Sequence, residues 1–206
     1  MLRQVAAHTP GEFETMYSST PPWDIGRPQP ALAALAEDGA WRGRVLDAGC
    51  GTGEHALLAA SLGLDATGVD SAPTAIEIAR RKARDRSLPV RFVLASALEL
   101  DSLGERFDTV IDSGLFHVFD DEGRRRYVEA LRAVVVPGGR CFVLCFSDRQ
   151  PGQEGPRRVS EAEIRASFAE GWSVDAVEQA ILAVNPNVVD FAPAGAQAWR
   201  VALTRI

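Results

Sequence analysis

Cysteine is scarce in this chain, at three in 206 residues, and an odd, small number is a poor basis for a disulfide framework. Sparse cysteine is typical of a reducing compartment, so we expect a cytoplasmic protein. No apolar run reaches the roughly 18 residues that a membrane span needs, and the N-terminal MLRQVAAHTPGEFETMY has no apolar stretch of signal-peptide length. These absences argue against secreted and transmembrane classes of protein.

Positive charge is also in short supply. Lys and Arg number 22 against 28 Asp and Glu, which gives a net charge of −6. Proteins that bind nucleic acid or anionic membrane surfaces need a positive field, so we expect neither partner. With 46% hydrophobic and 24% charged residues, the composition is that of one ordinary globular domain with a sizeable core.

The first 30 residues are predicted to be mostly irregular and to form an arm. Residues 18–30 contain four prolines and a glycine, which excludes a helix interior or a sheet ladder there. Pro30 suits the first turn of a short helix over 31–38 that stops at Gly39. The remaining residues, 31–206, are expected to form the main domain.

Strand and helix patterns alternate through that domain, which predicts parallel strands with right-handed crossovers. The last two strands have no helix between them and should pair antiparallel at the sheet edge. The prediction is an α/β, three-layer αβα sandwich with a Rossmann-like, mostly parallel seven-stranded sheet and an antiparallel last strand. Strands are expected at 44–48, 64–70, 90–95, 107–112, 140–146, 172–184 and 198–205, and helices at 54–62, 73–86 (capped by Ser71), 120–135 and, after a capping box at Ser160 and Glu163, through 169.

A glycine-rich turn follows the first strand, with Gly49, Gly51 and Gly53 at alternate positions. Such glycines allow a close backbone approach to a ligand and a sharp entry into a helix. The run from Gly51 also fits the dinucleotide pattern G-x-G-x-x-A. Asp47 precedes the glycines, however, where it would repel a pyrophosphate and attract an ammonium group. We therefore expect a ligand with a cationic amino-acid end.

Asp70 ends the second strand, 23 residues after Asp47. A carboxylate at this position can accept both hydroxyls of a ribose. It can also simply complement the dipole of the helix that follows. Together with the glycine turn, it predicts a nucleoside with a free ribose.

The motifs VLDAGCGTG at 45–53, GVDS at 68–71, FDTVID at 107–112 and VPGG at 136–139 resemble those of class I S-adenosylmethionine-dependent methyltransferases. The resemblance spans residues 40–206. It implies S-adenosyl-L-methionine as the cofactor, bound at Asp47, Gly49, Cys50, Gly51, Gly53, Asp70, Ser71 and Asp112. The family commonly has an Asp for the adenine amino group after the third strand, whereas this chain has Ser96, followed by Ala97, whose backbone would assist.

The arm segment TPPWDIGRPQP at 20–30 looks like the lid motif of small-molecule methyltransferases, including thiol, halide and thiopurine enzymes. Together with DSGLFH at 112–117 and EGP at 154–156, it is most similar to mycobacterial methyltransferases of quinones and alkylquinolone-type toxins. The resemblance implies a lid over residues 1–30, with Trp23 and Arg27 near the cofactor. Trp23 would face the sulfonium by cation–π attraction or anchor the arm, and Asp24 and Arg27 would pair or contact the methionine end.

His117 is the best candidate for a general base, because an imidazole can take a proton at neutral pH. The alternative is that it orients its loop. We expect a flat aromatic acceptor held by Phe13, Tyr17, Trp23, Ser113, Phe116 and His117. No residue spacing indicates a metal site. The runs 80–82 and 124–126 are predicted to be solvated helix faces.

The resulting hypothesis is a methyltransferase acting on an oxygen or nitrogen of a small aromatic or heterocyclic molecule such as a quinone, phenol or quinolone. Two alternatives stay open, namely S-methylation of a thiol or thiopurine, and cofactor binding without catalysis. The protein is expected to be a monomer or homodimer.

Overall fold

The computed structural model describes residues 10–153, 155–185 and 195–206 and has one seven-stranded sheet of order β3-β2-β1-β4-β5-β7-β6. Strands β1 to β5 are parallel, and β7 is antiparallel to both of its neighbours, β5 and β6. This confirms the predicted sheet. The strands are β1 (Arg44–Ala48), β2 (Asp65–Asp70), β3 (Val90–Leu94), β4 (Phe107–Ser113), β5 (Val135–Phe146), β6 (Trp172–Leu182) and β7 (Ala196–Arg205).

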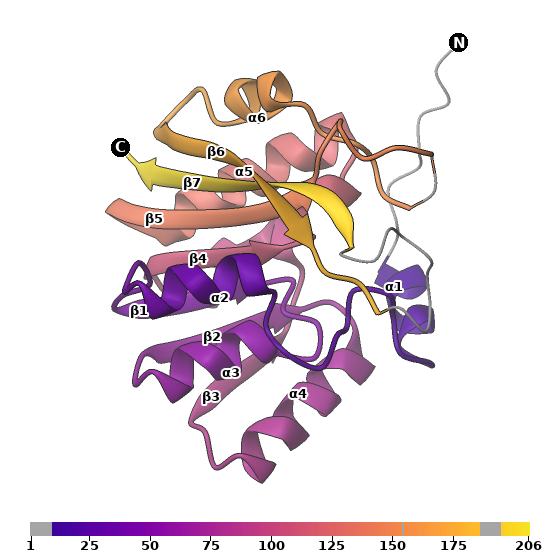
Figure 1. Cartoon of the computed structure of the whole chain (residues 1–206). Helices are drawn as coiled ribbons and strands as arrows, with labels where there is room; N and C mark the ends of the chain where they lie inside the picture. The colour runs from indigo at the N-terminus through magenta and orange to yellow at the C-terminus, as the bar shows by residue number, and fades with distance from the viewer. Residues whose placement is uncertain (1–9, 154, 186–194) are drawn as a thin grey trace.

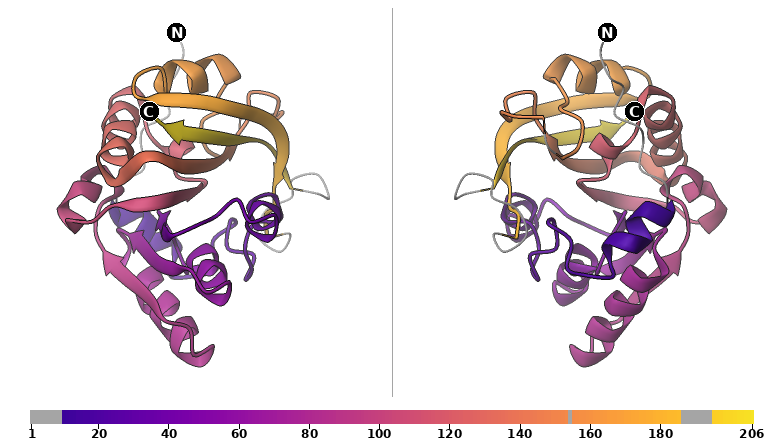
Figure 2. Two further views of the ribbon diagram at one scale, coloured as in Figure 1. Left: turned by 90° about the vertical axis from the view of Figure 1, so that its left-hand side faces the viewer. Right: turned by 90° about the vertical axis from the view of Figure 1, so that its right-hand side faces the viewer.

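Helices cover both faces of the sheet (Figures 1 and 2). One face carries α2 (Pro30–Glu37), α3 (Glu54–Ser61) and α4 (Pro73–Asp85), and the other carries the 3-10 helix η1 (Ala97–Leu103), α5 (Asp121–Val134) and α6 (Glu161–Ser167). Alternate residues of β1 supply the two cores, since Val45 packs on the α2 side and Leu46 on the α5 side. The three-layer prediction is confirmed.

Two helix starts follow directly from the sequence. Asp120 caps α5, because its Oδ1 accepts from Gly123 N–H at 2.7 Å. Ser160 and Glu163 form the predicted capping box of α6, in which each side chain accepts from the other residue's backbone amide. These local bonds fix where each helix begins.

Within the described part of the arm, α1 (Pro10–Met16) is a short helix at the end of the sheet beside α4 (Figure 1), and residues 17–29 form no helix or strand, in agreement with a mostly irregular segment. Other local predictions were wrong. Ser71 does not cap α4, because Ala72 is the N-cap residue and its amide donates to Asp70 Oδ1. Strand β5 begins at Val135, before the Pro-Gly-Gly turn, and the short 3-10 helices η1 and η2 (Phe116–Val118) were not predicted.

Each of two helix faces predicted to be solvated contains a cation that is partly or fully buried. Arg124 of α5 is 4% exposed, and its guanidinium lies over the Phe116 ring at 4.7 Å and within 3.6 Å of Glu163. Lys82 of α4 forms an ion pair with the buried Glu54. Charge alone did not distinguish these residues from their exposed neighbours. In the part of the chain that is described, no helix is both long and apolar enough to span a membrane.

Candidate active site

The glycine turn joins β1 to α3 at the C-terminal ends of the parallel strands. Gly49, Gly51 and Gly53 all have positive φ, at 69°, 52° and 87°, a region that favours glycine. At Gly53 a Cβ would also lie 2.6 Å from the Phe92 ring and 2.9 Å from Ala79. The turn thus requires glycine for both its backbone shape and its packing.

Asp70 joins this turn to the end of β2. Its Oδ2 accepts from Gly51 N–H at 2.8 Å and its Oδ1 from Ala72 N–H at 2.9 Å. Burial raises the pKa of Asp70, while the amides of Ala72 and Gly51 oppose that shift. The carboxylate is therefore held in place beside the glycine turn, where it was predicted to meet a ribose.

Asp47 lies beneath the same turn and is 1% exposed. Its Oδ2 accepts from Ala56 N–H at 3.1 Å, whereas its Oδ1 is buried and has no hydrogen-bond donor among the described residues. Burial raises the pKa of Asp47 to about 7, and the nearby Asp70 and Asp112 add to the shift. A buried acceptor without a donor is costly, so the site favours a ligand that brings one.

The arm covers the glycine turn. Tyr17 is buried, and its hydroxyl accepts from Trp23 Nε1 at 3.2 Å and lies 2.7 Å from where a Cβ on Gly51 would be. Trp23 packs edge-on against Phe13 and Tyr17, in a small cluster with Ala72 and Ala75 of the α4 N-terminus. Tyr17, predicted as an acceptor contact, thus lies against the glycine turn, and its contact with an acceptor stays a prediction.

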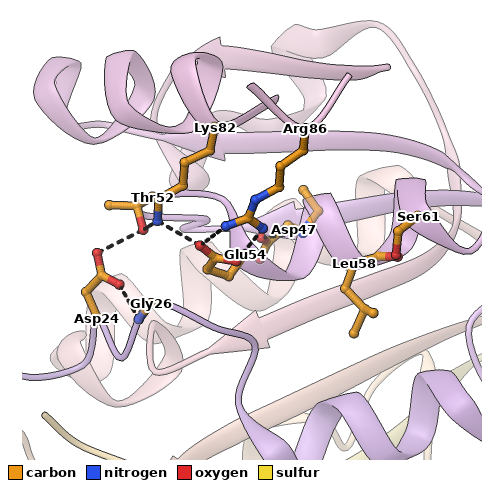
Figure 3. A network of polar contacts seen from close by, with 10 residues as sticks. Asp24, Gly26, Asp47, Thr52, Glu54, Leu58, Ser61, Lys82 and Arg86 are labelled. Carbon is orange, nitrogen blue, oxygen red and sulfur yellow. Dashed lines mark hydrogen bonds and ion pairs between the residues drawn. The ribbon is translucent and has the colours of Figure 1, made fainter. Parts of the chain in front are cut away.

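Asp24 connects the arm to the turn by hydrogen bonding, as Figure 3 shows. Its Oδ2 accepts from Thr52 Oγ1 at 2.9 Å and its Oδ1 from Gly26 N–H at 3.0 Å. It does not take up the alternative pairing with Arg27, whose side chain is exposed. The arm is therefore anchored by Asp24 rather than by its arginine.

The residues predicted to hold an adenine lie after β3. Ser96 Oγ accepts from Leu98 N–H at 3.2 Å and caps η1, which begins at Ala97. Ser96, Ala97 and Ser71 are all half-buried at the C-terminal edge of the sheet. They are placed where the predicted contact requires, and the contact itself stays a prediction. Cys50 is buried among Ala56, Leu57, Ile76 and Phe92.

The loop after β4 is organised by Asp112, which is fully buried. Its Oδ1 accepts from the amides of Leu115 and Phe116 at 2.8 and 3.3 Å, and its Oδ2 accepts from Tyr127 Oη at 2.9 Å. Burial raises the pKa of Asp112 to about 7. Its oxygens thus shape the loop through bonds within the protein, and its predicted contact with a cofactor stays a prediction.

Phe116 was predicted to contact the acceptor, and the structure places its side chain in the core, so the contact stays a prediction. Its side chain is 0% exposed, stacks on Phe168 with ring centroids 5.5 Å apart, and carries the Arg124 guanidinium on its ring. The 3-10 turn of η2 directs it into the core. Ser113, at the end of β4, is half-buried.

His117 is 4% exposed and its Nδ1 accepts from Phe146 N–H at 2.9 Å. Its ring packs edge-on against the Phe146 ring, with centroids 5.0 Å apart. Because Nδ1 uses its lone pair for this bond, the proton of the neutral ring resides on Nε2. The loop histidine is thereby tied to the end of β5.

The sequence interpretation missed Thr52, Glu54 and Lys82, which form one polar network (Figure 3). Thr52 lies between two glycines of the motif and Glu54 begins the predicted helix that follows it, and neither was assigned a role. The feature that marks this network is the burial of a charged side chain, since Glu54 is only 7% exposed. Sequence patterns alone do not reveal that burial. Glu154 of the predicted EGP motif lies outside the described residues.

Comparison with known proteins places this site in a context. A methyltransferase-domain family model matches residues 45–139, from β1 to the turn in β5. A 2-heptyl-1-hydroxyquinolin-4(1H)-one methyltransferase of Mycobacteroides abscessus is 40% identical over 91% of this chain and 83% of its own length. A probable thiol methyltransferase of Arabidopsis thaliana is 29% identical over 90% of this chain and 84% of its own length.

Solved structures agree with this comparison. A structure reported for the conversion of a disulfide bond into a thioacetal group during echinomycin biosynthesis has a TM-score of 0.86 and 38% identity, over 96% of this chain and 93% of that one. A Burkholderia thailandensis 1,6-didemethyltoxoflavin N1-methyltransferase with bound S-adenosylhomocysteine has a TM-score of 0.75 and 22% identity, over 100% and 92% of the two chains. The second likeness is one of fold.

Proposed function

The chain belongs to the S-adenosylmethionine-dependent methyltransferases, and from this premise we propose that it methylates an oxygen or nitrogen of a small aromatic heterocycle. The single observation that carries the acceptor class is the 40% identity to a hydroxyquinolone methyltransferase over 190 residues, which are 91% of this chain. The net charge of −6 supports a small molecule over nucleic acid as the acceptor.

The residues at the glycine turn fit the cofactor. Bound S-adenosylmethionine supplies a methyl group activated by a positively charged sulfur. The donor that Asp47 Oδ1 lacks is one that the ammonium of its methionine end would provide. Asp70, fixed by two backbone amides, would hold the ribose hydroxyls. The chain's own contribution is then to bind and orient, which can account for a large part of the acceleration of a bimolecular transfer.

Cofactor affinity should depend on pH through Asp47. With a pKa of about 7 in the free protein, this carboxyl is mostly protonated at pH 6 and mostly ionised at pH 8. Because the ionised form attracts the ammonium, S-adenosylhomocysteine binding is expected to weaken about tenfold as the pH falls from 8 to 6. Isothermal titration calorimetry across this range measures the effect.

Asp47→Asn is the control, since an amide does not titrate. This variant should bind about tenfold more weakly at pH 8 and show an almost flat pH profile. Asp70 and Asp112 are the other carboxyls whose charge reaches Asp47. A slope that survives unchanged in Asp47→Asn would assign the titration to one of them.

We propose that His117 positions the β4 loop through its bond from Phe146. A base role at Nε2 requires the tautomer with a proton on Nδ1, which would break that bond. Asparagine can present an oxygen to the same amide, so His117→Asn should keep kcat within about fivefold, whereas His117→Ala should lose more than tenfold. Loss of about 100-fold or more in both variants, together with loss of the acidic limb of the pH–rate profile, would instead support the predicted general base.

The acceptor is identified with a panel of hydroxyquinolones, phenols and thiols, each incubated with the enzyme and methyl-labelled cofactor. We expect label on the hydroxyquinolones or phenols. S-methylation is the second candidate, because the structure from echinomycin biosynthesis, whose reaction involves sulfur, is 38% identical to this chain. Turnover confined to thiols would select it, and cofactor binding without a labelled product from any acceptor would favour a non-catalytic role.

A further inference from the structure

Lys82 is the only lysine of the 206 residues, while the other 21 basic residues that make up the total of 22 are arginines. It lies on α4 with its side chain 22% exposed. Its Nζ donates to Thr52 Oγ1 at 2.7 Å and to Glu54 Oε1 at 2.8 Å. A compact ammonium with three donors suits this position between a hydroxyl and a carboxylate better than a planar guanidinium would.

The direction of the hydrogen bonds follows from the chemistry of the groups. An ammonium only donates, so Thr52 Oγ1 accepts from Lys82 and gives its own single proton to Asp24 Oδ2 at 2.9 Å. The chain of contacts therefore runs from a cation through a hydroxyl to an anion. A hydroxyl polarised in this way forms a stronger bond to the carboxylate than an isolated one.

Glu54 fixes the other end of this chain. Its carboxylate is 7% exposed and accepts from Lys82 and from both terminal nitrogens of Arg86. The neighbouring cations hold the pKa of Glu54 below its usual value, against the effect of burial. In Figure 3 Lys82 of α4 and Arg86, which follows the last residue of α4, lie on one side and Asp24 of the arm on the other, with Thr52 and Glu54 between them.

Several hydrogen bonds tie down the arm in the described residues. Glu14 accepts from Thr74 at the start of α4, the carbonyl of Pro22 accepts from Asn185 N–H at 2.7 Å, and Gln29 exchanges two hydrogen bonds with Ala183 and donates its backbone amide to His55 Nε2. Asp24 binds Thr52, and of these contacts it is the one made to the glycine turn. It also lies next to Trp23, whose partner Tyr17 approaches Gly51.

We propose that Lys82, acting through Thr52, is a positioning residue that holds the arm closed over the glycine turn and so sets the rate at which the cofactor leaves. A ligand seated on the turn lies under the arm, and its release requires the Asp24–Thr52 bond to open. The inference rests on the cofactor site and is independent of the acceptor's identity, so its test uses S-adenosylhomocysteine alone.

The test compares Thr52→Val, Thr52→Ser and Lys82→Met. Valine removes the hydroxyl at nearly constant size, and we expect the dissociation constant for S-adenosylhomocysteine to rise about tenfold, mainly through a faster off-rate measured by stopped flow. Lys82→Met should raise it about fivefold. Thr52→Ser keeps the hydroxyl, so its dissociation constant and its off-rate should be those of the parent protein. Hydrogen exchange of residues 17–26 in the ligand-free protein should quicken in the valine and methionine variants.

Arg86→Met is the matched control, because Arg86 binds the same Glu54 carboxylate but makes no bond to Thr52. It should lower the melting temperature while leaving cofactor release and arm exchange as in the parent protein. If Arg86→Met and Lys82→Met accelerate release equally, or if Thr52→Val changes neither release nor exchange, the proposal is overturned. A failure of the acceptor panel with these results intact would concern the proposed function alone.

Discussion

Replacing Asp70 by alanine is expected to weaken S-adenosylhomocysteine binding about 100-fold, because the variant loses two sets of hydrogen bonds to a charged carboxylate. The carboxylate holds the amides of Gly51 and Ala72, and it is also the group we expect to meet the ribose. The loss of the amide bonds and the loss of the ribose contact both weaken binding of the same ligand, because Gly51 belongs to the turn that we expect to lie beneath the cofactor. Calorimetric titration of the folded variant gives the affinity directly.

Asp65→Ala is the matched control for this prediction. Asp65 is the first residue of the same strand, β2, at the opposite end from Asp70, and its exposed carboxylate pairs with Arg44. Its loss should change affinity less than about twofold, because exposed ion pairs contribute little. Asp70→Asn should fall between the two. Equal affinity of Asp70→Ala and the parent protein would remove Asp70 from the cofactor site.

Gly53→Ala is expected to destabilise the protein by about 3 kcal/mol and to abolish measurable cofactor binding at micromolar concentrations. About 1 kcal/mol comes from placing alanine at a φ of 87°, and about 2 kcal/mol from forcing a methyl group against Phe92 and Ala79. The clash displaces the N-terminus of α3 and with it the turn. Urea denaturation and a ligand thermal-shift assay measure the two effects.

Gly63→Ala is the control that separates the cost of the positive φ from the cost of the steric clash in Gly53→Ala. Gly63 has a similar φ of 81°, but no atom lies within 4 Å of the position of its Cβ. This variant should lose only about 1 kcal/mol and bind the cofactor normally. If both variants lose the same stability, packing at Gly53 contributes nothing beyond its backbone conformation.

Local patterns were enough to predict the sheet and the turn. The alternation of apolar runs and glycines gave β1 as Arg44–Ala48 without error, and it placed Asp47 and Asp70 at the edge where the structure has them. The antiparallel pairing of the last two strands was predicted because no helix lies between them, whereas the order of the strands in the sheet was not predicted. These features depend on residues close together in the chain.

Predictions that depended on side-chain direction or on distant contacts did less well. Phe116 and His117 are adjacent and both buried, and the turn geometry of η2 determines that Phe116 stacks on Phe168 while His117 accepts from the amide of Phe146. The contact from Asp24 to Thr52 crosses 28 residues, and that from Lys82 to Thr52 crosses 30. No periodicity in the sequence encodes such pairs, so Lys82 was taken for a surface charge.

The arm's apolar contacts form a cluster of their own. Tyr17 and Trp23 pack with Ala72 and Ala75 and are not members of the larger clusters on either face of the sheet. Undocking the arm therefore costs only that small patch and a few hydrogen bonds, which is far less than the free energy of global unfolding. We expect the arm to behave as a separate foldon, detaching and reattaching many times while the rest of the domain stays intact.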